Sequence, residues 1–194
     1  MSSYGSPVRR GIGAGFGASL RRGLAVAIAV ALSATAATAA PLIERLTPEV
    51  LAVVWPDVAE YKLGAESGKP PAIPVLKGTD VVGYIFSTLD VVAAPGYSVV
   101  PFDGIGGVRL DGTITGAKVI SHREPYILND RVRQPKLDTY MAAHAGKSAT
   151  GPNAGLLPPD FITGATVSGR AMRAGLFDAA RIVDRKSTRL NSSH

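Results

Sequence analysis

The stretch SVVPFDGIGGVRLDGTITGAKVISH, residues 98–122, decides the fold of this chain. Its two halves, residues 98–110 and 113–122, are rich in valine and isoleucine, and Asp111-Gly112 separates them. An Asp-Gly pair favours the two-residue turns that join antiparallel strands, because glycine tolerates a positive φ. The stretch therefore predicts a β-hairpin.

A further strand is predicted upstream of this hairpin. Residues 79–92, TDVVGYIFSTLDVV, are dominated by β-branched, aromatic and other apolar residues that pack well in a sheet. Residues 94–97, APGY, would turn the chain into the hairpin. The three segments together predict an antiparallel meander of three strands.

Helices are predicted both before and after the meander in the sequence. Thr47 is a candidate N-cap for a short helix that has Pro48 at its first position and that Pro56 ends. Residues 68–78, GKPPAIPVLKG, contain too many prolines for a helix and predict an extended linker. The class predicted is therefore α+β, a small antiparallel sheet with packed helices.

Two more helices are predicted after the hairpin. Residues 135–146 have Pro135 near the start and Gly146 as the stop signal. Ser168 is a candidate N-cap for the last helix. One face of that helix carries apolar side chains at three- and four-residue steps, which indicates burial: Met172, Leu176, Ala179, Ala180 and Val183.

The net charge of +6 does not indicate a nucleic-acid surface. The excess of positive charge lies in residues 1–39 and in residues 184–194, whereas residues 40–183 carry equal numbers of acidic and basic residues. A neutral middle lacks the basic patch that a polyanion needs, so no nucleic-acid partner is expected. The absence of cysteine excludes disulfides and cysteine-ligated iron–sulfur clusters within this chain.

Residues 1–39 resemble a secretory signal. Arginines precede a short apolar run at 23–34, and Ala37-Thr38-Ala39 fits a cleavage site. The run is shorter than the roughly 20 residues of a membrane-spanning helix. Export with cleavage after Ala39 is predicted, and an uncleaved signal anchor stays open as the alternative.

Residues 184–194, DRKSTRLNSSH, resemble the in-frame translation of a common sequencing adapter. The segment is polar, has no apolar period and follows a helix that has not reached a stop signal. We expect this tail to be non-native and the chain to be truncated after Val183.

Neither metal nor hydrolytic chemistry is indicated elsewhere in the sequence. His122 and His144 are isolated from any cluster of potential ligands, so a metal site is not expected. Residues 166–170, TVSGR, lack the first glycine of a nucleophile elbow. Residues near Lys147 lack the first glycine of a phosphate-binding loop.

The segment DFITGATVSG, residues 160–169, places the Thr166 hydroxyl behind a Gly-Ala pair at the start of the last predicted helix. A capped turn with small residues for packing is the simplest interpretation. However, the string closely resembles the flavinylation motif of FMN-binding domains. The motif positions are Asp160, Thr163, Gly164, Ala165, Thr166 and Ser168.

The resemblance extends upstream of the motif. Residues 94–125 are similar to the pattern that precedes the motif in the same family, in which Tyr97, His122 and Glu124 match family positions. The chain departs from the pattern at Val99-Val100, where the family often has Gly-Pro.

The resemblance implies that FMN is joined through its phosphate to the Thr166 hydroxyl. A separate flavin transferase, using FAD and Mg²⁺, would carry out the attachment, and Asp160 would be recognised by that enzyme. Amides at the start of the helix would favour the remaining phosphodiester charge, with Arg170 or Arg173 as candidate helpers. Tyr97, His122 and Glu124 would be cofactor-binding residues, although each could instead stabilise the sheet.

The expected organisation is a signal in residues 1–39, a helix and Pro-rich linker in 40–78, an FMN-binding domain in 79–183 and the tail in 184–194. Within that family, the sequence is most similar to the exported N-terminal domain of NosR/NirI-type membrane regulators of nitrous oxide and nitrite reduction. This implies an electron carrier, not a stand-alone enzyme, at the periplasmic face of the inner membrane. Its partners would be the membrane and iron–sulfur portions of the full-length protein and a periplasmic redox protein.

Two alternatives stay open. The flavin subunit of an Rnf- or Nqr-type ion-translocating oxidoreductase shares the domain and the motif. A flavin-free periplasmic sensor module of the same fold is the second alternative.

Overall fold

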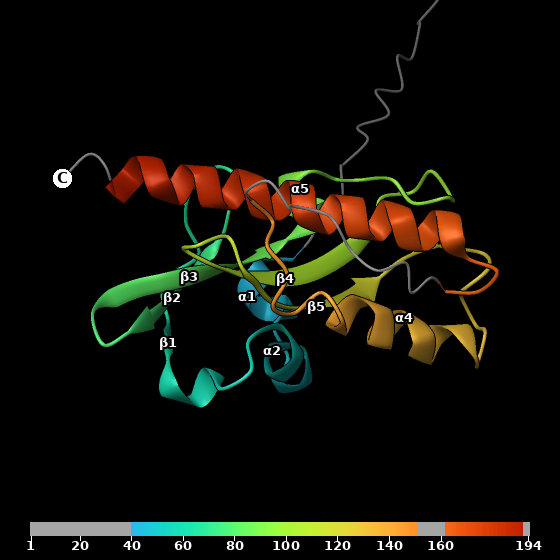
Figure 1. Cartoon of the computed structure of the whole chain (residues 1–194), viewed down its shortest axis with the longest axis horizontal. Helices are drawn as coiled ribbons and strands as arrows, with labels where there is room; N and C mark the ends of the chain where they lie inside the picture. The colour runs from blue at the N-terminus through green and yellow to red at the C-terminus, as the bar shows by residue number, and fades with distance from the viewer. Residues whose placement is uncertain (1–39, 151–161, 192–194) are drawn as a thin grey trace, which may run out of the picture. The chain divides into compact units, whose positions relative to one another are not determined.

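A single antiparallel sheet forms the centre of the fold, with helices on both faces (Figure 1). The structure is a computed structural model, and it describes residues 40–150 and 162–191, with side chains described as far as Arg185. The five strands lie in chain order and each pairs with the next: β1 Lys62–Leu63, β2 Ile73–Lys77, β3 Asp80–Ser87, β4 Asp103–Arg109 and β5 Ile114–Ser121. The predicted α+β class is confirmed.

The predicted hairpin is β4–β5. The left-handed Gly112 (φ +80°) forms its turn, where the amide of Thr113 donates to Asp111 Oδ1 at 2.9 Å. The predicted third strand, residues 79–92, is shorter than expected. β3 ends at Ser87, whose hydroxyl accepts the amides of Leu89 and Asp90 and so caps the helix α3, Thr88–Val91.

The meander of three strands is corrected to five, because the predicted Pro-rich linker contains β2 and the short strand β1 precedes it. Pro74 lacks an amide hydrogen, which made a strand improbable from sequence. It lies beyond the two residues at which β1 pairs with β2, and its carbonyl accepts the amide of Gly64 at 2.8 Å. The strand therefore tolerates this proline.

The N-terminal helices cover one face of the sheet. They are α1 Leu42–Arg45, α2 Pro48–Val54 and the 3-10 helix η1 Val58–Glu60. The predicted cap of α2 is confirmed, since the Thr47 hydroxyl accepts the Val50 amide at 3.3 Å and Pro48 is the first helical residue. Their apolar side chains join Ile73, Ile85 and Ile105 of the strands in one buried cluster.

Two glycines let α2 approach the sheet closely. Gly107 of β4 and Gly116 of β5 are paired in register. A Cβ on Gly116 would lie 2.0 Å from the Val53 carbonyl oxygen, and one on Gly107 would lie 2.8 Å from that of Val54. Helix backbone therefore rests directly on sheet backbone at this point.

A buried ion cluster joins α1 to the sheet. Arg45 donates to Asp103 at 2.6 Å and to Ser87 at 3.1 Å, and it also pairs with Asp90. The Ser87 hydroxyl donates to the other oxygen of Asp103 at 2.6 Å. Burial lowers the pKa of Arg45, but its hydrogen bonds to Asp103 and Asp90 more than offset this and hold the pKa above its usual value.

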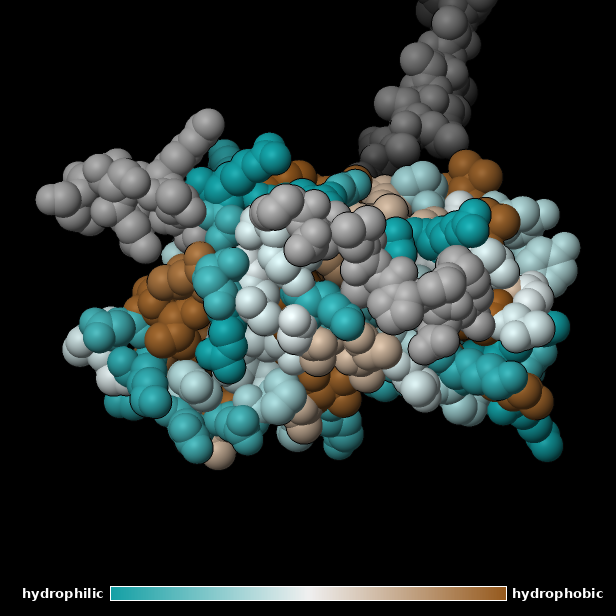
Figure 2. Space-filling model, viewed as in Figure 1, coloured by the Kyte–Doolittle hydropathy of each residue, from teal (hydrophilic) through white to brown (hydrophobic). Residues whose placement is uncertain are grey.

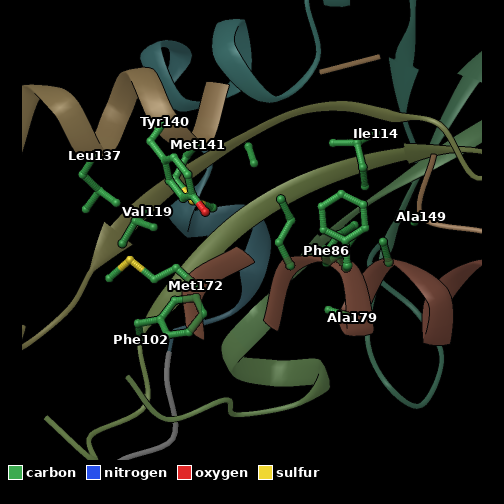
Figure 3. Close-up of a cluster of buried hydrophobic side chains, with 14 of the residues drawn as sticks. Phe86, Phe102, Ile114, Val119, Leu137, Tyr140, Met141, Ala149, Met172 and Ala179 are labelled. Atoms are coloured by element: carbon green, nitrogen blue, oxygen red, sulfur yellow. The ribbon is translucent and has the colours of Figure 1, made fainter. Parts of the chain in front are cut away.

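The opposite face of the sheet is covered by α4 Arg133–Ala142 and α5 Thr166–Asn191. Figure 3 shows the cluster in which side chains of these helices meet those of the sheet, such as Phe86 and Val119. The apolar stripe predicted for the last helix is buried there in full, from Met172 to Val183. Gly106 leaves room for Leu176, because a Cβ on this glycine would lie 2.6 Å from the Leu176 side chain.

Both of these helices begin before the segments predicted for them. α4 begins at Arg133, so Pro135 lies near its start as predicted, and Asp130 Oδ1 accepts the amides of Val132 and Arg133 at 2.8 and 2.7 Å. α5 begins at Thr166, so Ser168 lies inside its first turn and is not the N-cap. α5 also continues to Asn191, into the tail expected to be non-native, which contains no glycine or proline before that residue; the origin of that tail stays a prediction.

Within the described residues, no helix combines the length and the apolar character needed to cross a bilayer. On the face shown in Figure 2, hydrophilic residues are interspersed with small hydrophobic patches. The predicted signal in residues 1–39 lies outside the described residues.

Candidate cofactor site

Thr166 is the first residue of α5 and follows a tight turn. The Ala165 amide donates to the Ile162 carbonyl at 2.8 Å, and Gly164 adopts φ +82° in the third position of this turn. A positive φ in that position is typical of a type II turn and favours glycine. Ile162 and Ala165 are buried, whereas Gly164 is exposed and Thr166 is half-buried. The core thus anchors the turn, and Thr166 belongs to the first turn of a helix, whose amides have no partner within the helix itself.

A cavity of about 300 Å³ lies beside this turn. One wall is the peptide from Gly164 to Ser168, which includes Thr166, and the other is formed by Tyr97 and Tyr126. The two tyrosine rings are 48% and 50% exposed, and their centroids are 5.5 Å apart at an interplanar angle of 55°. The cavity therefore combines a hydroxyl and backbone amides at one side with two half-exposed aromatic rings at the other.

Glu124 connects the two walls. Its carboxylate is fully buried and accepts hydrogen bonds from the Tyr97 amide (3.1 Å), from the Ser98 amide (3.2 Å) and hydroxyl (2.9 Å), and from the Ser168 hydroxyl. Gly96 makes room for it, because a Cβ there would lie 1.9 Å from Glu124 Oε1. One side chain thus fixes the Tyr97 turn to the first turn of α5.

The charge of Glu124 is favoured by these donors. Burial by itself raises the pKa of this carboxyl group. The hydrogen bonds from Ser168, Ser98 and Tyr97 outweigh burial and bring the pKa below its usual value. Glu124 is therefore ionised at neutral pH.

His122 supports Glu124 from behind and does not line the cavity. Its Nδ1 lies 3.2 Å from the Glu124 amide and accepts from it, and its Nε2 lies 3.0 Å from Gln134 Oε1. Nδ1 is thus the acceptor from the main chain, and Nε2 is the nitrogen that faces Gln134. His122 orients the β5-to-α4 connection on which Glu124 and Tyr126 lie.

Arg133 ties the same connection to the Thr166 turn. Its Nε donates to the Thr163 carbonyl at 3.1 Å, and its Nη1 donates to Asp130 Oδ2 at 2.8 Å and to the Tyr126 carbonyl at 3.4 Å. The guanidinium lies so close to Gly164 that a Cβ there would be 2.7 Å from Nη2. Gly164 is thus required by its φ and by the position of Arg133.

The structure brings together most of the predicted site residues. Thr166, Gly164, Ala165 and Ser168 line the cavity with Tyr97, while Thr163 is exposed at the turn. Glu124 and His122 do not line the cavity. Glu124 binds the lining residues Tyr97 and Ser168, and His122 binds Glu124. Asp160 lies outside the described residues.

Tyr126, Val167 and Arg133 were not predicted from the sequence as site residues. Tyr126 follows Glu124 by two residues and Val167 lies inside the motif, so their positions in sequence were the available signals. Arg133 belongs to a part of the chain with no motif, and only the fold brings it to Thr163. The predicted helpers Arg170 and Arg173 lie farther along α5; Arg170 is exposed and Arg173 is half-buried.

Comparison with known proteins gives one family match. Residues 100–181 match the family model of the FMN-binding domain, a range that includes Glu124, Tyr126 and Thr166. The predicted resemblance to this family is confirmed over that range.

Two curated proteins are similar to the chain. Protein NirI of Paracoccus denitrificans (strain Pd 1222) is 31% identical over 114 residues, which is 58% of this chain and 17% of that protein. A component of the ion-translocating oxidoreductase complex of Vibrio atlanticus (strain LGP32) is 27% identical over 140 residues, which is 69% of this chain and 64% of that component. The chain thus spans less than two thirds of the length of either relative.

Proposed function

We propose that this chain, with its FMN-binding domain match at residues 100–181, is a periplasmic electron-transfer domain that carries FMN covalently on Thr166. The observation that carries the proposal is the position of the Thr166 hydroxyl. It lies at the start of α5, in the wall of a cavity whose other wall is aromatic. When bound, the flavin supplies the one- and two-electron redox chemistry of the domain.

The described residues fit such a cofactor. Backbone amides at the start of α5 provide donors and a positive dipole end for a phosphodiester on Thr166. Gly164 and Ala165 leave the backbone bare beside the hydroxyl, so a second protein can approach it. Glu124, supported by His122, holds the Tyr97 turn and Ser168 in place around the cavity.

The attachment requires a partner enzyme, because a threonine hydroxyl is a weak nucleophile. A flavin transferase with Mg²⁺ brings FAD to the turn. The Thr166 oxygen forms a bond to the FMN phosphorus, the pyrophosphate bond of FAD breaks, and AMP leaves while the hydroxyl proton passes to a base of the transferase. The transferase recognises three positions of this chain, which are Asp160 and the exposed residues Thr163 and Gly164.

The wider role that we propose is that of a NosR/NirI-type membrane flavoprotein. In such a protein the domain passes electrons between a periplasmic redox partner and membrane and iron–sulfur portions beyond this chain, in support of nitrous oxide reductase. The similarity to NirI supports this assignment. The alternative is the flavin subunit of an ion-translocating oxidoreductase, and the longer alignment with the Vibrio atlanticus component favours it.

The test is attachment of the flavin in cells that also express a flavin transferase. Intact-protein mass spectrometry should show one added FMN in the wild type and in Thr166→Ser, which keeps a hydroxyl, and none in Thr166→Ala. Thr139→Ala removes a threonine of α4 outside the cavity and should be loaded like the wild type. Absence of FMN from the wild type would contradict the proposal and favour a flavin-free module, whereas persistence of FMN in Thr166→Ala would contradict attachment at Thr166.

A further inference from the structure

Tyr97 and Tyr126 are the two exposed aromatic side chains of the described residues. Both tyrosines are about half exposed, their rings contact each other, and both line the cavity. Apolar rings of this size usually bury most of their surface, and a half-exposed pair beside a cavity leaves ring faces and edges available to a ligand. The third exposed apolar side chain of the cavity is Val167, which is 59% exposed.

The backbones that carry both rings are fixed relative to Thr166. Glu124 binds the Tyr97 amide and the Ser168 hydroxyl with the same carboxylate. Arg133 binds the Tyr126 carbonyl and the Thr163 carbonyl with the same guanidinium. Each tyrosine is thus connected through one buried or half-buried ionic side chain to the turn that presents Thr166.

The cavity is also chemically divided. Its α5 side offers a hydroxyl and helix amides, which suit a phosphate, and its tyrosine side offers aromatic surface, which suits a flat ring. Its volume of about 300 Å³ lies at the small end of ligand pockets, so it suits the packing of part of a ligand.

We propose that Tyr97 and Tyr126 form the subsite against which the isoalloxazine ring of the attached flavin packs, and that Glu124 and Arg133 are positioning residues for this pair. The proposal rests on the proposed function and assigns a role to Tyr126 and Arg133. Tyrosine next to a flavin quenches its emission by donating an electron to the excited ring, which gives a readout other than electron-transfer activity.

The experiment compares flavin fluorescence in the folded, flavin-loaded protein with that of the same sample after denaturation. The wild type should emit severalfold less when folded. Tyr97→Leu and Tyr126→Leu should each recover part of this loss, and the double variant should recover most of it. Tyr61→Leu removes a half-buried tyrosine that packs on Trp55 in the other part of the fold, and it should behave like the wild type.

The outcomes separate the two proposals. Loaded leucine variants that emit no more than the wild type would overturn the ring subsite and leave attachment at Thr166 intact, whereas a wild type without flavin would overturn the proposed function itself. If the leucine variants carry no flavin, the Tyr126→Trp variant tests the ring subsite instead. It keeps an aromatic ring and a better electron donor, so its folded emission should fall below that of the wild type, and unchanged emission would overturn the ring subsite.

Discussion

Two buried carboxylates of this protein are stabilised by different kinds of partner. Asp103 is 4% exposed and is paired with the guanidinium of Arg45, which also binds Asp90. Glu124 is fully buried, and each of the donors described above is a neutral amide or hydroxyl. In the first arrangement the carboxylate is paired with a cation, and in the second it is not.

The difference matches what each group connects. The Arg45 cluster joins α1 to the sheet and its members do not line the cavity, so its charge pairing makes a rigid junction away from the site. Glu124 connects the two walls of the cavity and leaves a negative charge behind the site. We infer that charge pairing serves the fold in the first region, and that neutral hydrogen bonds serve the cofactor site in the second.

The largest effect on stability is expected when the cation that pairs with Asp103 is removed. Arg45→Met leaves Asp103 and Asp90 without their cation and should lower the free energy of unfolding by about 3–5 kcal/mol. Urea denaturation measures this. Asp178→Asn, which removes the exposed partner of an ion pair with Arg181, should cost less than about 1 kcal/mol. Equal costs for the two variants would remove the distinction between a buried and an exposed ion pair.

A smaller effect is expected at the second carboxylate. Glu124→Gln keeps the shape but replaces one acceptor oxygen by an amide group that faces donors, which should cost about 1–3 kcal/mol. Glu60→Gln is the matched exposed control and should change stability by less than about 0.5 kcal/mol. If Glu124→Gln were as stable as the wild type, the hydrogen bonds to the carboxylate would not hold the walls together.

The charge of Glu124 also predicts a pH dependence. Because the folded-state pKa of Glu124 lies below its unfolded value of about 4.3, its contribution is complete above that value and is lost as pH falls through the folded pKa. The difference in unfolding free energy between wild type and Glu124→Gln should therefore be constant from about pH 8 to about pH 5 and should shrink below about pH 4. Urea midpoints at each pH check this, and a difference that grew on acidification would contradict it.

The smallest effect concerns the turn that Glu124 holds. Val99 adopts φ +64° and is 80% exposed, and a β-branched residue is strained there. Val99→Gly removes about 1–2 kcal/mol of strain and adds about 0.4–1 kcal/mol of chain entropy to the unfolded state, so a net gain of about 0.5 kcal/mol is expected. Val100→Gly gains no such relief and should destabilise the protein. Thermal unfolding of both variants tests the pair, and a loss of stability in Val99→Gly would show that the turn is not strained.

Local signals in the sequence predicted what local interactions determine. Asp111-Gly112 predicted the hairpin, Thr47 and Pro48 predicted the start of α2, and the spacing from Met172 to Val183 predicted the buried face of α5. The positive φ at Val99 favours glycine, which the family resemblance led us to expect there, so the valine of this chain is the strained choice.

What the sequence did not predict depends on contacts between distant residues. Ser168 resembles an N-cap, but its hydroxyl donates to Glu124, 44 residues away in sequence, and the helix begins before it. Arg45 reaches Asp103 across 58 residues, which brings the predicted helix and linker into the same fold as the sheet. No periodicity or motif encodes such pairs.

The contact of α2 with Gly107 and Gly116 has a consequence for how related sequences can diverge. Main chain meets main chain there, so no side chain can be enlarged or trimmed to compensate for a change. Even a single methyl group at Gly116 would push α2 off the sheet, whereas the outward side chains of α2 are free to vary. Relatives that retain this helix should therefore differ along its outward face and yet agree on two residues that belong to other elements.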